Sequence, residues 1–235
     1  MADDLSAFLA TREPTPDRPL LGLTVLVVED SRFACEAMRL LCLRSGARIR
    51  RADCLRSARR HLMTYRPTVV IVDLGLPDGS GLDLISEVAA RRPRVPALLG
   101  TSGDAGAEER ARAAGADGFL AKPIESLSAF QRTILAALPA TPKPVAAGQG
   151  GAEDDRVHPD PLALRDDLAH VADLLGDAPE GPALDYLAQF LSGVALSAHD
   201  APLRAAAEAL ARGRAGDMQR LSGLVRDRLA AGAPF

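Results

Sequence analysis

Five short apolar runs, each followed by a longer amphipathic stretch, constrain the fold of this chain more than any other feature. The runs cover residues 23–28, 47–53, 68–73, 96–101 and 118–122. Strand-like and helix-like segments that alternate in this way are typical of repeated βα units, in which helices connect parallel strands. We therefore predict an α/β fold with a five-stranded parallel sheet.

The composition of the runs indicates their order in the sheet. Residues 25–28 and 69–72 are apolar throughout, as expected of central strands covered by helices on both faces. Residues 47–51 alternate and carry three arginines, which favours an edge strand. This pattern predicts a doubly wound sheet in the order 2-1-3-4-5. Its ligand site should lie at the carboxyl ends of strands 1 and 3, where the winding reverses.

Polar side chains end four of the five runs, and the predicted order brings them to one edge of the sheet. They are Glu29, Asp30, Asp73, Thr101, Ser102 and Lys122. Three carboxylates this close would repel one another unless a cation lay between them, and Mg²⁺ prefers such oxygen ligands. One carboxylate could then attack a phosphorus atom while the amine of Lys122 neutralises the phosphoryl oxygens.

Four motifs together resemble the response-regulator receiver family closely. They are VLVVEDS at 25–31, VVIVDLGLPDGSG at 69–81, LLGTSG at 98–103 and AAGADGFLAKPI at 113–124. The resemblance covers about residues 22–139 and implies a flavodoxin-like receiver fold that works as a switch in two-component signalling. A histidine kinase or a histidine-phosphotransfer protein would be the phosphoryl donor.

The resemblance also implies a role for each site residue. Asp73 would be the phosphoacceptor, and Mg²⁺ would be held by Glu29, Asp30, Asp73 and the carbonyl of Gly75. Lys122 and Thr101 would hold the phosphoryl group. Phe119 would be the aromatic switch, and Thr101 would be repacked together with it on phosphorylation. The stretch from Thr101 to Lys122 is one residue shorter than the family pattern, so Ser102 is an alternative to Thr101. Such a protein phosphorylates and dephosphorylates itself and is not a dedicated enzyme.

Two glycines near this edge bear on the lifetime of an acyl phosphate. Gly75 and Gly103 carry no side chain that could cover the site. We therefore expect water to reach the site easily and the phosphorylated state to be short-lived.

Proline- and glycine-rich segments divide the chain. We predict an N-terminal extension at 1–20, a receiver domain at 21–139, a linker at 140–160 and a helical domain at 161–235. The last part contains helical stretches at about 161–176, 182–198, 201–212 and 215–231, which predicts a small all-α bundle. The second stretch has a seam of apolar residues at alternating spacings of three and four. These are Leu184, Leu187, Leu191, Val194 and Ala198.

The helical part leaves the output of the switch open. It weakly resembles the first part of a histidine-phosphotransfer bundle, but MQRLSGLVRDRL at 218–229 has neither the His nor the Lys of that family. We expect a module that dimerises or docks on a protein partner. The alternative is a DNA-binding transcriptional regulator. Residues 160–235 hold seven Arg, no Lys and eleven acidic residues, so nucleic-acid binding is expected to be unlikely, although five of the arginines lie within 212–228.

The remaining features concern the compartment. The start of the chain has no basic, apolar leader, and no apolar run is long enough to cross a membrane. The three cysteines cannot all pair within one molecule, which favours a reducing compartment. We therefore expect a cytoplasmic protein without membrane contact. The four histidines, at 61, 158, 170 and 199, are each expected to be structural or solvent-facing.

Overall fold

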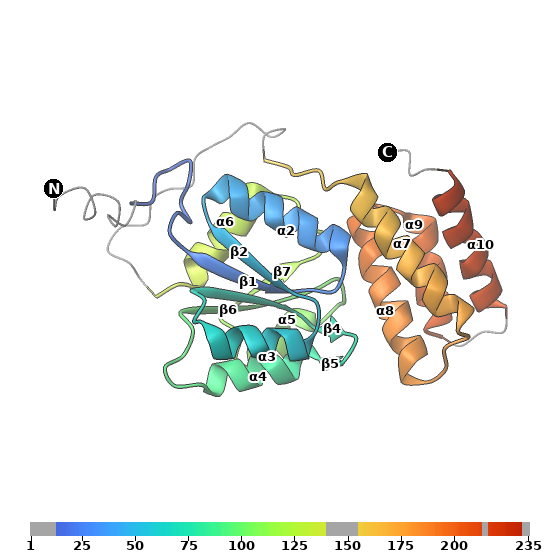
Figure 1. The fold of residues 1–235 in the computed structure, drawn as a ribbon, viewed down its shortest axis with the longest axis horizontal. Helices are drawn as coiled ribbons and strands as arrows, with labels where there is room; N and C mark the ends of the chain where they lie inside the picture. The colour runs from blue at the N-terminus through green and yellow to red at the C-terminus, as the bar shows by residue number, and fades with distance from the viewer. Residues whose placement is uncertain (1–12, 140–154, 213–215, 232–235) are drawn as a thin grey trace.

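The computed structural model describes residues 13–139, 155–212 and 216–231, which form an α/β body and a helical bundle beside it (Figure 1). The amphipathic start of the predicted extension and most of the predicted linker lie outside the described residues. Within the described ranges, no helix is both long and apolar enough to cross a membrane.

The sheet of the α/β body has the predicted topology. Its strands are β1 (Thr24–Val28), β2 (Arg48–Ala52), β3 (Val69–Asp73), β6 (Ala97–Ser102) and β7 (Gly118–Ala121). All neighbours are parallel, in the order β2-β1-β3-β6-β7. Every residue of β3 is buried, whereas the edge strand β2 has mostly exposed residues, as their compositions predict. The expected 2-1-3-4-5 order is confirmed.

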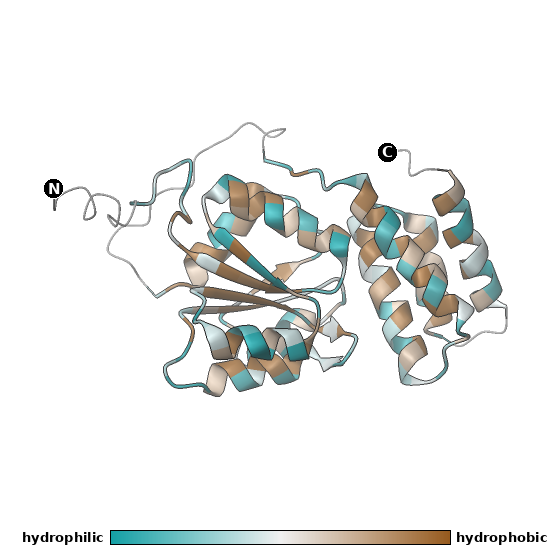
Figure 2. Ribbon diagram, in the orientation of Figure 1, coloured by the Kyte–Doolittle hydropathy of each residue, from teal (hydrophilic) through white to brown (hydrophobic). Residues whose placement is uncertain are grey.

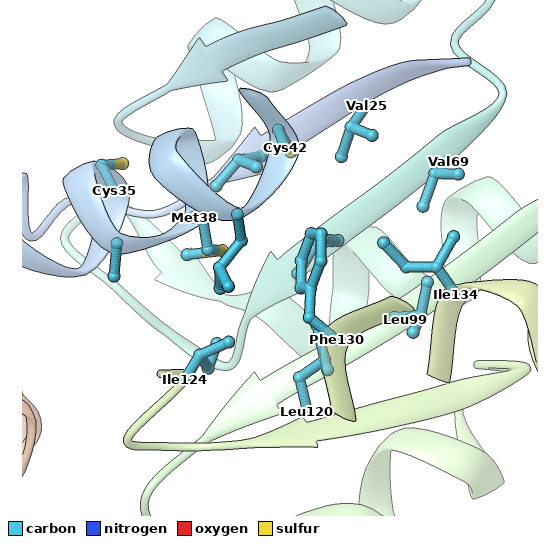
Figure 3. Close-up of a cluster of buried hydrophobic side chains, with 14 of the residues drawn as sticks. Val25, Cys35, Met38, Cys42, Val69, Leu99, Leu120, Ile124, Phe130 and Ile134 are labelled. Carbon is cyan, nitrogen blue, oxygen red and sulfur yellow. The ribbon is translucent and has the colours of Figure 1, made fainter. Parts of the chain in front are cut away.

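Helices cover both faces of this sheet. They are α2 (Arg32–Ser45), α3 (Leu55–Thr64), α4 (Gly81–Ala90), α5 (Ala107–Ala113) and α6 (Leu127–Ala137). One core lies under α2 and α6, where Phe130 and Met38 are fully buried against the strands (Figure 3). A second core lies under α3, α4 and α5. Figure 2 shows the hydrophobic strands between the two helical layers.

A small hairpin follows β3 and is absent from the sequence prediction. It consists of β4 (Gly75–Leu76) and β5 (Gly79–Ser80), paired antiparallel. Two-residue strands are too short to show a periodic pattern, which explains the omission. The hairpin brings the start of α4 close to β3. A Cβ atom at Gly81 would lie 1.9 Å from the carbonyl oxygen of Asp73, so only glycine fits there.

The C-terminal part is all-helical, as predicted. Its helices are α7 (Pro161–Gly176), α8 (Pro182–Ser197), α9 (Ala201–Leu210) and α10 (Asp217–Ala230). Asp160 and Asp200 cap α7 and α9, each followed by a proline in the first turn. The predicted seam of α8 forms the centre of the bundle core. Leu187, Leu191 and Val194 are buried, and Leu184 and Ala198 are partly buried.

Two predicted boundary segments end in residues that belong to the α/β body. Leu20, at the end of the predicted extension, is fully buried in the core under α2. Near the end of the predicted linker, Asp155 bonds Ser126 and Ser128 at the start of α6, and Val157 is buried in the same core. The segment between the two bodies is therefore shorter than the sequence suggests, and it reduces to residues 158–160.

Candidate functional site

A buried lysine and three carboxylates meet at the carboxyl edge of the sheet. Lys122, which follows β7, donates a hydrogen bond of 3.0 Å to Asp73 at the end of β3. The same ammonium forms a 2.8 Å ion pair with Glu29, which follows β1. The side chains of Lys122, Glu29 and Asp73 are only 5%, 1% and 10% exposed. Strand order alone predicted this meeting of residues that lie far apart in the sequence.

The three carboxylates form a site of the right chemistry for a hard divalent cation. Oxygens of Glu29, Asp30 and Asp73 all lie within 4.8 Å of one another. Burial and the charge of Asp73 raise the pKa of Glu29, and burial raises the pKa of Asp30 to about 7. When all three are ionised, the carboxylates outnumber the single ammonium of Lys122. An oxygen-only donor set with excess negative charge fits Mg²⁺.

The surroundings of Lys122 favour its charged form although the side chain is only 5% exposed. Burial lowers the pKa of the ammonium, but the charges of Asp73 and Glu29 outweigh this effect and raise the pKa. An ammonium group beside Asp73 is suited to bind anionic oxygens. It is the only cationic side chain among the described residues that line the cavity at Asp73.

The sequence left open whether Thr101 or Ser102 would contact the phosphoryl group, and the hydroxyls of these two residues lie in different surroundings. The hydroxyl of Thr101 is fully buried and donates a 2.7 Å hydrogen bond to the carbonyl of Leu120. Ser102 lines the cavity together with Asp73 and Lys122, and its hydroxyl accepts from the amide of Asp104. Ser102 therefore lines the cavity at Asp73, whereas Thr101 does not, and which hydroxyl would contact a phosphoryl group stays a prediction.

Gly75 lines the cavity at Asp73, whereas Phe119 does not. Gly75 is part of the cavity wall, consistent with the ligand role expected of its carbonyl. The ring of Phe119 is partly buried in the core under α4 and α5, where it lies against Gly100. Its switching role stays a prediction.

The helical bundle covers the site, contrary to the expectation of an open one. The hydroxyl of Tyr186 in α8 donates a 2.6 Å hydrogen bond to Asp30. One turn further along α8, the side chain of Gln189 lies against Gly75 and bonds Asp104. Leu196 packs on Gly103. The two glycines make room for side chains of α8, so the predicted easy access of water is wrong for this conformation.

A second stripe of residues on α8 makes this contact. Tyr186, Gln189, Gly193 and Leu196 follow one another at spacings of three, four and three, parallel to the apolar seam. Gly193 passes close over the site, since a Cβ atom there would lie 3.8 Å from the ammonium of Lys122. In a sequence, a helix face with Tyr, Gln and Gly is typical of a solvated face, so this stripe does not predict a contact with the sheet.

Helix α7 fastens the bundle to the start of α2. Asp167 is 3% exposed and accepts hydrogen bonds from the hydroxyl of Ser31 and the amides of Arg32 and Phe33, at 2.8, 2.8 and 3.0 Å. The neighbouring Asp166 forms an ion pair with Arg32. Phe33, although it belongs to α2, is buried in the core of the bundle. The two bodies thus share buried polar and apolar contacts.

Beside this interface lies a cleft of about 740 Å³. Its walls include Asp30, Asp53, Asp173 and Tyr186, and His170 lies at the same opening. The ring of His170 packs edge-on against Phe190, with centroids 5.9 Å apart. Of the other histidines, His61 packs on Tyr65 and His199 pairs with Glu125. No histidine is among the described residues around the Asp73 cavity.

Comparisons with known proteins agree with this geometry. Residues 25–133 match the family model of the response regulator receiver domain. TcrX of Mycobacterium tuberculosis, named as a probable transcriptional regulatory protein, is 37% identical over 104 residues, which are 43% of this chain and 44% of TcrX. The KDP operon transcriptional regulatory protein KdpE of Escherichia coli is 32% identical over 122 residues, 51% of this chain and 54% of KdpE. The chain thus spans about half the length of these relatives.

Receiver domains are also among the solved structures that match this chain. One of them is the receiver domain of a sensor histidine kinase from Pseudomonas aeruginosa, determined with a magnesium ion coordinated in its active-site cleft. The identity is 24%, the TM-score is 0.45, and the match covers 49% of this chain and 97% of that one.

Proposed function

Because residues 25–133 form a response regulator receiver domain, we propose that Asp73 accepts a phosphoryl group and that the chain is a switch in two-component signalling. The donor would be a histidine kinase or a histidine-phosphotransfer protein. The observation that carries the proposal is the ammonium of Lys122 between Glu29 and Asp73, with Asp30 close by. The cation that Glu29, Asp30 and Asp73 would hold is Mg²⁺.

The chemistry follows from these side chains. An oxygen of Asp73 attacks the phosphorus of a phosphohistidine, the new O–P bond forms, and the P–N bond breaks with its electron pair left on the donor nitrogen. The ammonium of Lys122 exchanges its contact with Asp73 for one with a phosphoryl oxygen. Ser102 can donate a hydrogen bond to a second one. Bound Mg²⁺ supplies charge neutralisation at the remaining oxygens.

The reaction is performed on the chain itself. Water hydrolyses the acyl phosphate, which regenerates Asp73 and releases inorganic phosphate, so both steps of the cycle take place on the side chain of Asp73. The protein is therefore a phosphoacceptor with self-directed activity rather than a dedicated enzyme.

For the output, the geometry supports control of the helical bundle. Phosphorylation would alter the contacts between the site and α8, and the bundle would then act on a protein partner or on a second copy of the chain. The contact of Tyr186 with Asp30 supports this, because it couples the bundle directly to the acidic site.

A second candidate is transcriptional regulation. The names of TcrX and KdpE favour it, and the expectation that nucleic-acid binding is unlikely has no support from these relatives. The family match ends at residue 133, before the bundle. On α10, Arg220 and Arg226 are exposed and could contact a DNA backbone, whereas Arg228 pairs with Asp200.

Phosphotransfer from a panel of histidine kinases, in Mg²⁺ and with Asp73→Asn as control, tests the switch. We expect label on the wild type and none on Asp73→Asn; label on both would refute Asp73 as the acceptor. A mobility shift with genomic fragments at several salt concentrations separates the outputs. Tight, salt-dependent binding that needs phosphorylation would favour transcription.

A further inference from the structure

We infer that α7 and α8 carry a receiver-docking face that, in this conformation, closes the site of its own receiver domain against phosphoryl donors. The docking face consists of Asp166, Asp167, Tyr186, Gln189, Gly193 and Leu196. The inference rests on the proposed function of Asp73. It makes the bundle a competitor of the donor, since both need the same edge of the sheet.

The first argument is space. Asp73 is 7% exposed, and the cavity between it and α8 has a volume of about 20 Å³. A cavity needs roughly 10–15 Å³ to hold one water molecule. The cavity therefore has room for a water molecule, but not for a phosphoryl group and the imidazole that delivers it. Helix α8 must move before Asp73 can react.

The second argument is competition for a ligand. The hydroxyl of Tyr186 donates to Oδ2 of Asp30, one of the three residues whose oxygens could hold a cation. A cation bound through that oxygen would withdraw electron density from it and repel the hydroxyl proton of Tyr186, so the hydrogen bond would weaken. Binding of Mg²⁺ and docking of α8 should therefore oppose each other.

The third argument is that the interface between the bundle and α2 is buried and complementary. Asp167 satisfies three donors at the start of α2, among them the amides of Arg32 and Phe33, which no intrahelical carbonyl can reach. The ring of Phe33 completes the core of the bundle. Such buried, complementary contacts are typical of a specific interface.

The helical bundle can separate from the receiver domain while both the bundle and the receiver domain stay folded. Asp155 and Val157 hold the incoming chain on α6, and Asp160 caps α7 on the bundle side. The backbone of residues 158–160 lies between these two anchors. Rotation within it would separate the docking face from the site and leave both hydrophobic cores intact, apart from Phe33.

The test compares the full chain with two variants that weaken docking. Asp167→Arg places a cation against Arg32 and removes the three hydrogen bonds, whereas Tyr186→Phe removes only the hydroxyl. Asp227→Arg makes the same charge change on exposed α10 and is the control. Acetyl phosphate with Mg²⁺ is the donor, and intact-protein mass follows the reaction. Amide exchange measures protection of β4 and α8, and calorimetry measures Mg²⁺ affinity.

We expect Asp167→Arg to be phosphorylated at least about tenfold faster than wild type, because the loss of bonds to a charged acceptor shifts a docking equilibrium by that order. Its β4 and α8 should lose protection. Tyr186→Phe should bind Mg²⁺ more tightly, and Asp227→Arg should behave as wild type.

The possible failures are distinguishable. Equal phosphorylation rates and equal Mg²⁺ affinities in all four proteins would overturn the closed-site inference and leave the proposed function standing. If no protein is phosphorylated, the proposed function fails. In that case amide exchange and Mg²⁺ affinity still test the closed-site inference. The inference is overturned as well if both measurements are the same in the variants and in the wild type.

Discussion

Removal of the Lys122 ammonium should reveal how strongly the acidic site depends on it. In Lys122→Met the carboxylates of Glu29 and Asp73, with side chains only 1% and 10% exposed, lose their common countercharge. Removing one partner of a buried ion pair costs about 3–5 kcal/mol. Because domains are stable by only about 5–15 kcal/mol, the loss is a large fraction of the total. The melting temperature should fall by roughly 10–20 °C.

Urea unfolding followed by circular dichroism, with a chelator present, measures this loss. The matched control is Arg39→Met, which breaks the 2.7 Å pair of Arg39 with Glu36 on the surface of α2. A surface pair contributes about 0–1 kcal/mol, so this variant should stay close to wild type. The double variant Asp73→Asn with Lys122→Met should lose less than Lys122→Met alone, since one of the repelling carboxylates is gone.

The reasoning would be refuted if Lys122→Met lost no more stability than Arg39→Met. Added Mg²⁺ provides a second check. A cation bound by Glu29, Asp30 and Asp73 should restore more stability to Lys122→Met than it adds to the wild type, because the variant has the larger unbalanced charge. Equal stabilisation of both proteins would argue against a shared cation site.

Three further predictions concern single features. Gly81→Ala should cost at least about 3 kcal/mol in urea unfolding, because its Cβ would meet the carbonyl of Asp73 at 1.9 Å; a loss below 1 kcal/mol would contradict this. The carboxylate of Asp78 accepts from the amides of Leu55 and Arg56 at the start of α3. Burial raises the pKa of Asp78, but these hydrogen bonds outweigh burial and hold the pKa in the folded protein below 3.8. The stabilisation from these bonds is therefore fully present above pH 3.8. It is lost as the pH falls through the pKa of Asp78 in the folded protein. Asp78→Asn should therefore cost about 1 kcal/mol at pH 7, and the difference from wild type in urea midpoint should shrink below pH 3.8; a constant difference would rule the effect out. Burial raises the pKa of both Cys35 and Cys42 to about 12, so a thiol reagent at pH 8 should label Cys54 first, and mass mapping that found Cys35 or Cys42 modified first would disprove it.

The sequence predicted the sheet because its strands carry an unambiguous pattern. Residues 25–28 and 69–72 are apolar on both faces, and the polar residues stand at the strand ends, so topology alone brought Glu29, Asp73 and Lys122 together. The choice between Thr101 and Ser102 could not be made in this way. The choice depends on which of the two hydroxyls donates to the carbonyl of Leu120. The packing of β6 against β7 decides this, and the sequence pattern does not show that packing.

The contact between the two bodies had no comparable signal. Hydrophobic periodicity identifies the side of α8 that packs in its own bundle, but Tyr186 and Gln189 lie on a polar side that usually faces water. The same holds for Asp167, whose partners at the start of α2 lie more than 130 residues away. Gly75 and Gly103 suggested an open site because the side chains that fill the space above them come from a distant segment.

The anchoring of residues 155–157 on α6 has a practical consequence for protein engineering. A chimera that joins another effector after residue 139 would discard Asp155 and Val157, so Ser126 and Ser128 would lose a partner and the core under α2 would lose a side chain. Fusion after residue 157 keeps both. Such a chimera would still present the ring of Phe33 to solvent, so a small polar residue there should improve its solubility.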